Sequence, residues 1–276
     1  MVKLYDRTAK ILLTTALIIV CLLYLFPILW FLMSSLKSGS ELFNYPLTIF
    51  PENIAWENFN NAWQALDFFK YFKNTLLSAT ITTVFTILAS ATCGYAFAKY
   101  DRKWLHIFFI CIIATTMLPT EVIMNPTFSV IKATGLYNKL AGIIIPSINT
   151  ATGIFMFRSF FVTVPDSLIE SARMDGASDG HIFFRIMLPI AKPIIMTLAI
   201  FSFQWRWNDY IWPLIVLNDP DKYTLQVALR SIVGAQNIDW TLLLSASVIS
   251  ILPLLLIFIV FQRYIMSAGS TEGMKE

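Results

Sequence analysis

The chain has 276 residues, of which 57% are hydrophobic and 13% are charged, whereas a soluble domain carries about 25% charged residues. This composition excludes an ordinary water-soluble domain and indicates a membrane protein, because a core of this size has no room for so much apolar surface. The formal net charge of +3 is dispersed, without the basic stripe of a nucleic-acid-binding protein. The cysteines Cys21, Cys93 and Cys111 lie in apolar stretches and have the spacing of neither a zinc site nor a disulfide framework.

Six apolar stretches are candidates for crossing a bilayer, which takes about 20 helical residues. In chain order they are residues 11–33, 74–98, 105–125, 140–157, 193–217 and 240–262. Pro119, Glu121 and Pro126 interrupt the third stretch. The stretches predict helices, because a membrane segment must satisfy its own backbone groups and the alternating pattern of barrel strands is missing. We therefore expect an all-α, polytopic membrane protein with six transmembrane helices in a single domain over residues 1–276.

The basic residues near the chain start and in the connections predict the orientation. Lys3, Arg7 and Lys10 precede the first apolar stretch, which is longer than the 7–15 residues of a signal-peptide core and is expected to be a retained helix. With the N-terminus in the cytoplasm, the cytoplasmic connections hold more Lys and Arg than the outer ones. Both termini are then cytoplasmic, residues 34–73 form a long external loop, and residues 158–192 form a long cytoplasmic loop.

Two segments of these loops predict helices outside the bilayer. The stretch from about Trp56 to Phe72 is expected to be a helix on the outer face. In the cytoplasmic loop, Ser167 and Glu170 have the spacing of a capping box, which predicts a helix over 167–174. A turn at Asp175-Gly176 and a second helix capped by Ser178 would complete a hairpin. The apolar residues expected to dock into a groove of a partner are Leu168, Ile169, Phe183, Phe184 and Ile186.

The sequence of this hairpin is similar to a known motif. Three residues separate Glu170-Ser-Ala from Gly176, and nine residues separate Gly176 from Ile186-Met-Leu-Pro. This pattern resembles the EAA loop of ABC importer permeases, with Ser171 in place of the first Ala. Residues 207–214, WNDYIWPL, are similar to the W-N-D/E-F-x-W-P-L segment of carbohydrate-uptake permeases. Residues 117–126 resemble a second segment of that group, and residues 261–276 resemble its tail, with Met274 and Glu276 departing from the pattern.

The resemblance covers nearly the whole chain and points to the maltose-type "G" permease subunits, the binding-protein-dependent transport inner-membrane components. It implies the type I permease fold of ABC importers, a heterodimer with a second homologous permease, two ATPase subunits and an extracytoplasmic solute-binding protein. It also implies a bacterial or archaeal cytoplasmic membrane. The chain contains no G-x-x-x-x-G-K-S/T motif of the kind that binds ATP. We therefore expect that it is not an enzyme and binds no cofactor, and that the partner ATPase subunits hold ATP and Mg²⁺.

Two sets of candidate site residues follow. The resemblance implies that the hairpin couples transport to the ATPase through Glu170, Ser171, Ala172, Asp175, Gly176, Ala177, Phe183, Phe184, Leu188 and Pro189. Polar and aromatic residues in or beside the apolar stretches are candidates for a solute path: Asn125, Asn149, Gln204, Trp205, Arg206, Asn208 and Asp209. Arg206 and Asp209, three residues apart, either form an ion pair on one helix face or lie where the helix breaks and face the outer water layer.

Sugar or oligosaccharide import through such a subunit is the predicted function. The alternative cargo is glycerol phosphate or another phosphorylated polyol. Arg206 is compatible with this alternative, because an anion requires a cationic partner. A membrane enzyme would need a nucleophile with its base or a carboxylate–histidine cluster, and His106 and His181 have no such neighbours in the sequence. A channel would need no loop for docking an ATPase.

Overall fold

The computed structural model of the protein describes residues 2–65, 67–234 and 237–270, and all regular structure in these ranges is helical. This confirms the predicted all-α class. The chain divides into two compact units. The first contains the residues up to Phe68 together with Leu229–Ile251, and the second contains Phe69–Ala228 together with the chain from Leu252 onwards. The part of the predicted tail motif beyond residue 270 lies outside the described residues.

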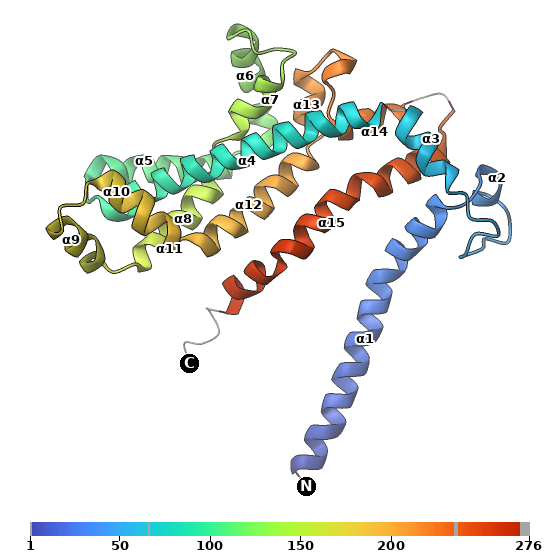
Figure 1. Cartoon of the computed structure of the whole chain (residues 1–276), viewed down its shortest axis with the longest axis horizontal. Coiled ribbons are helices and arrows are strands. Elements are labelled where there is room, and N and C mark those ends of the chain that lie inside the picture. Colours follow the sequence, from blue (N-terminus) through green and yellow to red (C-terminus); the bar gives the residue numbers. More distant parts are fainter. Residues whose placement is uncertain (1, 66, 235–236, 271–276) are drawn as a thin grey trace. The chain divides into compact units, whose positions relative to one another are not determined.

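The first unit begins with the helix α1 (Val2–Ser35) and continues through α2 (Gly39–Leu42) and α3 (Glu57–Ala65) (Figure 1). The chain after α1 is tied down by buried polar groups. Lys37, 2% exposed, donates to the carbonyl of Thr48. The amide of Asn58 donates to the carbonyls of Ser35 and Lys37 at 3.1 and 2.8 Å. The predicted external loop therefore has a fixed structure between α1 and α3, where the buried donors of Lys37 and Asn58 find backbone acceptors.

The second unit holds most of the remaining helices. In chain order they are α4 (Phe68–Lys99), α5 (Lys103–Ala114), η1 (Thr115–Met117), α6 (Thr120–Ala133), α7 (Leu140–Ile144), η2 (Ile145–Ser147), α8 (Ala151–Thr163), α9 (Asp166–Met174), α10 (Asp179–Ile182), the π-turn η3 (Phe183–Met187), α11 (Leu188–Ile190), α12 (Lys192–Trp207), α13 (Ile211–Val216) and η4 (Pro220–Lys222). The helices α14 (Leu225–Val233) and α15 (Trp240–Ser270) contribute residues to both units.

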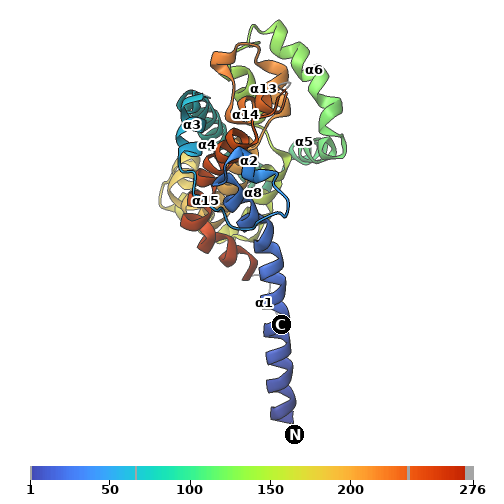
Figure 2. The same cartoon turned by 90° about the vertical axis from the view of Figure 1, so that its right-hand side faces the viewer.

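The helices that could cross a membrane agree with a polytopic protein. Within the part of the chain that the structure describes, four are long and apolar enough: Ala9–Ser35, Phe68–Lys99, Leu140–Thr163 and Trp240–Gln262. Two further candidates are bent pairs, Lys103–Met117 with Thr120–Ala133 at 111°, and Asp179–Ile190 with Lys192–Trp207 at 75°. Figure 2 shows the sharp angle between α5 and α6. The break falls at Leu118-Pro119, where the missing proline N–H ends the hydrogen-bond ladder. By length and composition, the described residues contain up to six candidate spans if each bent pair is counted as one.

One predicted element is wrong. The helix expected from about Trp56 to Phe72 is divided into α3, which ends at Ala65, and α4, which begins at Phe68. Asp67, between them, has a φ of +45°. A right-handed helix cannot pass through a residue in the left-handed region, so α3 and α4 are separate helices and the apolar residues after Asp67 belong to α4.

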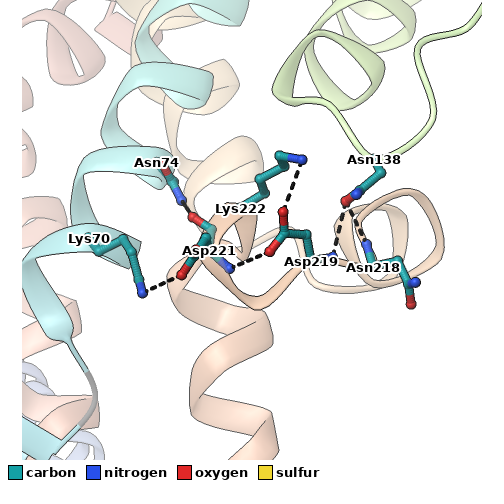
Figure 3. A network of polar contacts seen from close by, with 7 residues as sticks. All are labelled: Lys70, Asn74, Asn138, Asn218, Asp219, Asp221 and Lys222. Carbon is teal, nitrogen blue, oxygen red and sulfur yellow. Dashed lines mark hydrogen bonds and ion pairs between the residues drawn. The ribbon is translucent and has the colours of Figure 1, made fainter.

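The loop from Leu217 to Thr224 is held by polar contacts within the second unit, shown in Figure 3. Lys70 Nζ lies 2.8 Å from Asp221 Oδ1, and the amide of Asn74 donates to the carbonyl of Asp221 at 3.0 Å. On the other side, Asn138 Oδ1 accepts the backbone N–H groups of Asn218 and Asp219, both at 3.0 Å. The loop is thereby tied to α4 at one side and to the turn before α7 at the other.

Asp219 makes the stability of this loop dependent on pH. Its carboxylate accepts from Lys222 Nζ at 3.0 Å and from the Asp221 N–H at 3.1 Å, and these hydrogen bonds, Lys222 first, lower the pKa of Asp219. Because this pKa lies below the unfolded value of about 3.9, the stabilisation is complete above that value and is lost as pH falls through the lower folded pKa.

We therefore expect Asp219→Asn to lower the amide-exchange protection of residues 217–224 at neutral pH. In the unmodified protein the same loss of protection appears only in acid, below about pH 4. Hydrogen exchange read by mass spectrometry and expressed as protection factors measures both effects. Asp221→Asn keeps the Asp219 carboxylate but removes the contact of the loop with Lys70, so it measures the contribution of that second contact separately. Equal protection of the loop in Asp219→Asn and the unmodified protein at neutral pH would contradict this expectation.

Candidate functional site

The predicted hairpin is present as α9 and α10, joined by a turn at Asp175–Ser178 (Figure 1). Gly176 has a φ of +82°, and no atom lies within 4 Å of where its Cβ would be. The turn therefore requires glycine for its backbone conformation, while its tip stays open. Ser178 caps α10 as predicted, because its Oγ accepts the N–H of His181 at 3.3 Å. Arg173 Nη2 lies 3.0 Å from Asp179 Oδ1, a contact that closes the hairpin across the turn.

The start of α9 differs from the prediction. The helix begins at Asp166 after Pro165, and no side chain caps it, so the predicted capping box of Ser167 and Glu170 is wrong. Pro165 already supplies an extended residue before the helix, and Asp166 places a negative charge in the first turn, where the helix dipole favours it. Ser167 lies inside the first turn, and its carbonyl accepts the hydroxyl of Ser171 at 2.8 Å.

The hairpin is packed on the second unit by its apolar face. Ile169, Ala172, Ile182, Phe183 and Met187 are buried in one cluster with residues of α4, α8 and α12. The expectation that Ile169 and Phe183 dock into a partner is therefore wrong for this structure, because the chain buries both side chains in its own core. Other members of that predicted set remain accessible: Leu168 is 39% exposed and Phe184 57% exposed.

The contact between the hairpin and α4 is both aromatic and ionic. The Tyr95 ring lies 5.3 Å from that of Phe183, measured between centroids. Lys99 Nζ lies 2.7 Å from Asp166 Oδ1 and donates to the carbonyl of Val164 at 2.6 Å. The Lys99 side chain is only 6% exposed. An ion pair with one buried partner and an aromatic contact therefore attach the hairpin to the end of α4.

Two of the concave surfaces on the second unit contain predicted site residues. One, of roughly 530 Å³, is at the hairpin turn and is lined by Ala172, Asp175, Gly176, Ala177, Ser178, His181 and Ile186. The other, of roughly 550 Å³, lies where the helices break, and we call it the cleft. Its lining residues are Thr115, Thr116, Leu118, Thr120, Ile123, Met124, Thr127, Pro146, Ser147, Asn149, Ala151, Thr152, Trp205, Arg206, Asp209 and Trp212.

Arg206 is the central polar residue of the cleft. Its Nη1 donates to Ser147 Oγ at 2.9 Å and lies 3.4 Å from Asp209 Oδ2. The helix α12 ends at Trp207, so Asp209 lies just beyond it. Both readings of the sequence are therefore partly correct: the helix breaks in this region, and the ion pair still forms across the break. Arg206 also joins the end of α12 to the turn η2 before α8.

Four of the seven predicted solute-path residues line the cleft: Asn149, Trp205, Arg206 and Asp209. The structure does not bring the other three to it. Asn125 and Asn208 are exposed elsewhere, and Gln204 lines a smaller cavity of roughly 170 Å³ beside α15. The sequence reasoning missed the hydroxyl groups of the cleft, which belong to Thr115, Thr116, Thr120, Thr127, Ser147 and Thr152. Their only signal was the cluster of threonines around the break at Pro119.

An all-helical chain with several membrane-crossing helices, and with a polar cleft where those helices are interrupted, has the architecture of a membrane transport subunit. The chain belongs to the family of binding-protein-dependent transport system inner membrane components, which matches residues 90–268. This confirms the resemblance found in the sequence. The chain is thus a permease subunit of an ABC importer, a multi-pass membrane protein that works with separate ATPase subunits and a solute-binding protein.

Several individual proteins are similar over most of their length. The chain is 37% identical over 269 residues to the arabinooligosaccharides transport system permease protein AraQ of Bacillus subtilis (strain 168), covering 96% of each. It is 32% identical over 271 residues to the diacetylchitobiose uptake system permease protein NgcG of Streptomyces coelicolor, covering 97% of this chain and 89% of that one. It is 31% identical over 256 residues to the sn-glycerol-3-phosphate transport system permease protein UgpE of Yersinia pestis, covering 90% and 91%.

The fold is also similar to a solved structure. A chain of a bacterial ABC transporter involved in the import of the acidic polysaccharide alginate superposes with a TM-score of 0.85 at 26% identity. The match covers 94% of this chain and 97% of that chain. The arrangement of helices described above is therefore that of an ABC importer permease.

Proposed function

We propose that this permease subunit imports a sugar or an oligosaccharide. The observation that carries the proposal is the 37% identity to an arabino-oligosaccharide permease over 96% of both chains. The cleft supports it, because a polyhydroxylated solute needs many donors and acceptors and an apolar surface for its rings. Threonine and serine hydroxyls and the Asn149 amide supply hydrogen-bonding groups, and Trp205 and Trp212 supply the apolar surface.

The proposed assembly contains a second, homologous permease, two ATPase subunits and an extracytoplasmic binding protein in a bacterial or archaeal cytoplasmic membrane. ATP and Mg²⁺ bind to the ATPase subunits, and this chain holds no cofactor. Both termini and the hairpin lie on the cytoplasmic side, as the distribution of Lys and Arg in the sequence indicates. An open cleft of roughly 550 Å³ in this chain suits a site completed by the second permease.

In the proposed mechanism the hairpin around Gly176 docks into the ATPase subunit and transmits its closure. The tip of the hairpin is open, and Phe184 and Leu168 are exposed for contact with the ATPase. The Lys99–Asp166 ion pair and the Tyr95–Phe183 contact tie the hairpin to α4. A displacement of the hairpin is then carried to the helix bundle as a rigid-body movement, which changes access to the cleft from one side of the membrane to the other.

A phosphorylated polyol such as glycerol phosphate is the second candidate cargo. The similarity to UgpE of Yersinia pestis and the cation at Arg206 favour it. The Arg206–Asp209 contact opposes it, because the guanidinium already has a carboxylate partner and Asp209 repels a second anion.

The test is reconstitution of the chain with its second permease and ATPase subunits in proteoliposomes. ATPase activity and uptake are measured with arabino-oligosaccharides, diacetylchitobiose and glycerol 3-phosphate, each with a cognate binding protein. We expect stimulation by a neutral oligosaccharide. Stimulation by glycerol 3-phosphate alone would establish the second candidate instead, and a lack of response to all three would reject the proposed cargo class.

A further inference from the structure

The lining of the cleft carries two charged residues, Arg206 and Asp209, and their charges are opposite. Arg206 Nη1 lies 3.4 Å from Asp209 Oδ2, and the two side chains are 24% and 21% exposed. The remaining polar groups among the described lining residues are hydroxyls, an amide and indole N–H groups. The surface that this chain contributes to the cleft is therefore electroneutral, and its neutrality depends on one aspartate.

We infer that Asp209 determines the charge preference of the cleft. By neutralising Arg206 it makes the cleft select uncharged, hydroxyl-rich solutes over the acidic forms of the same solutes. An unpaired guanidinium would instead attract a carboxylate or phosphate, to which arginine binds with two parallel hydrogen bonds. The inference rests on the proposed function, since it concerns the solute that the proposed importer carries.

The hydrogen-bonding groups of the cleft lining agree with a neutral partner. Arg206 Nη1 already has two acceptors, Ser147 Oγ and the Asp209 carboxylate. Arg206 Nε and Trp212 Nε1 are buried and have no acceptor in the structure. Buried N–H groups are nearly always hydrogen-bonded, so these two unpaired donors are exceptions. A bound ligand could supply their acceptors after a small rearrangement of the cleft. A sugar hydroxyl accepts from such a donor and brings no charge.

Asp209 can be changed without removing its structural contacts. Its carboxylate accepts the backbone N–H of Trp212, in the first turn of α13. Asparagine serves about as well as aspartate at the start of a helix, because its side-chain oxygen accepts the same hydrogen bond. Asp209→Asn therefore removes the negative charge while keeping the size of the side chain and an oxygen that can accept the Trp212 N–H.

The experiment uses the complete transporter in lipid nanodiscs, without the binding protein, so that the preference of the binding protein does not enter. Arabinotriose and the aldonic acid made from it are the two probes, and isothermal titration gives the ratio of their dissociation constants. The variants are Asp209→Asn, Arg206→Gln and the double substitution. Asp221→Asn is the matched control, because it removes an aspartate from another cation pair that lies outside the cleft lining.

We expect Asp209→Asn to shift the ratio toward the acid by a factor of roughly ten to a thousand. The upper figure is that of one uncompensated charge about 4 Å away at an effective dielectric constant of about 20, and solvent and salt screening lower it. Arg206→Gln should shift it the other way, and the double substitution should restore it. A purely structural role of the pair would not produce opposite shifts that cancel.

The inference is overturned if Asp209→Asn and Asp221→Asn have the same ratio of dissociation constants for the two probes. It is also overturned if the double variant keeps the shift of Asp209→Asn or that of Arg206→Gln. In both cases the proposed function stands whenever the unmodified transporter imports the neutral sugar in proteoliposomes. If the unmodified transporter neither binds nor imports arabinotriose or any other neutral oligosaccharide, the proposed cargo class fails and the inference fails with it.

Discussion

A transporter carrying Gly176→Val is expected to hydrolyse ATP without importing solute. Gly176 has a φ of +82°, a region that costs an ordinary residue about 1–2 kcal/mol and a β-branched residue more. Valine would therefore shift the turn between α9 and α10 and displace the docking surface. Since about 1.4 kcal/mol corresponds to a factor of ten, we expect uptake in proteoliposomes to fall roughly tenfold or more, while basal ATPase activity is retained.

Two control variants separate the backbone from the surface. Gly176→Asn adds a side chain at the same open position but tolerates the left-handed conformation, so uptake should stay close to normal. Gly180→Ala, four residues later, introduces a Cβ that meets no atom within 4 Å and leaves the turn unchanged. Normal uptake by Gly176→Val would contradict the coupling role of the turn. Equal loss in the Asn and Val variants would show that the surface, and not the backbone conformation, matters.

The hairpin shows which structural features can be predicted from residues close together in the sequence. The predicted helix over 167–174 is found at Asp166–Met174, and the Ser178 cap and the Gly176 turn are both present. These features depend on residues within a few positions of one another, which the sequence displays directly. The sequence did not reveal that Phe183 is buried and the adjacent Phe184 exposed, because that depends on α4 and α8, which lie far away in the chain.

The cleft was predictable only in part for the same reason. A charge in an apolar stretch is conspicuous, so Arg206 and Asp209 were found from the sequence. Threonines in helices often donate to their own helix, as Thr115 and Thr116 do to the carbonyls of Ile112 and Ile113, and the sequence alone does not show which of them also line a cavity. Thr115, Thr116 and Thr120 reach the cleft because the chain turns by 111° between α5 and α6. That angle is a tertiary feature, which proline at 119 permits but does not specify.

In the proposed mechanism, movement of the hairpin reaches the bundle through the close contact between α4 and α8. Gly94 in α4 faces α8, and a Cβ at this position would lie 2.5 Å from Phe157 Cβ and 2.8 Å from the backbone nitrogen of Arg158. The obstructing atoms are a backbone atom and a Cβ, which no rotamer change can move away. Between membrane helices, van der Waals packing of small residues provides much of the association energy.

Gly94→Ala is therefore expected to force the two helices apart and to destabilise the subunit by about 1–3 kcal/mol, the usual cost of overpacking a well-packed core. The measurement is the thermal unfolding midpoint of the purified transporter in detergent, followed by the loss of its gel-filtration peak. Gly180→Ala in α10 is the matched control, because the same substitution meets no neighbour there and removes only backbone freedom. We expect a lower midpoint for Gly94→Ala and an unchanged or higher one for Gly180→Ala. Equal midpoints would mean that α4 and α8 are not in contact at Gly94, and the rigid connection from the hairpin to the bundle would then lack its central contact.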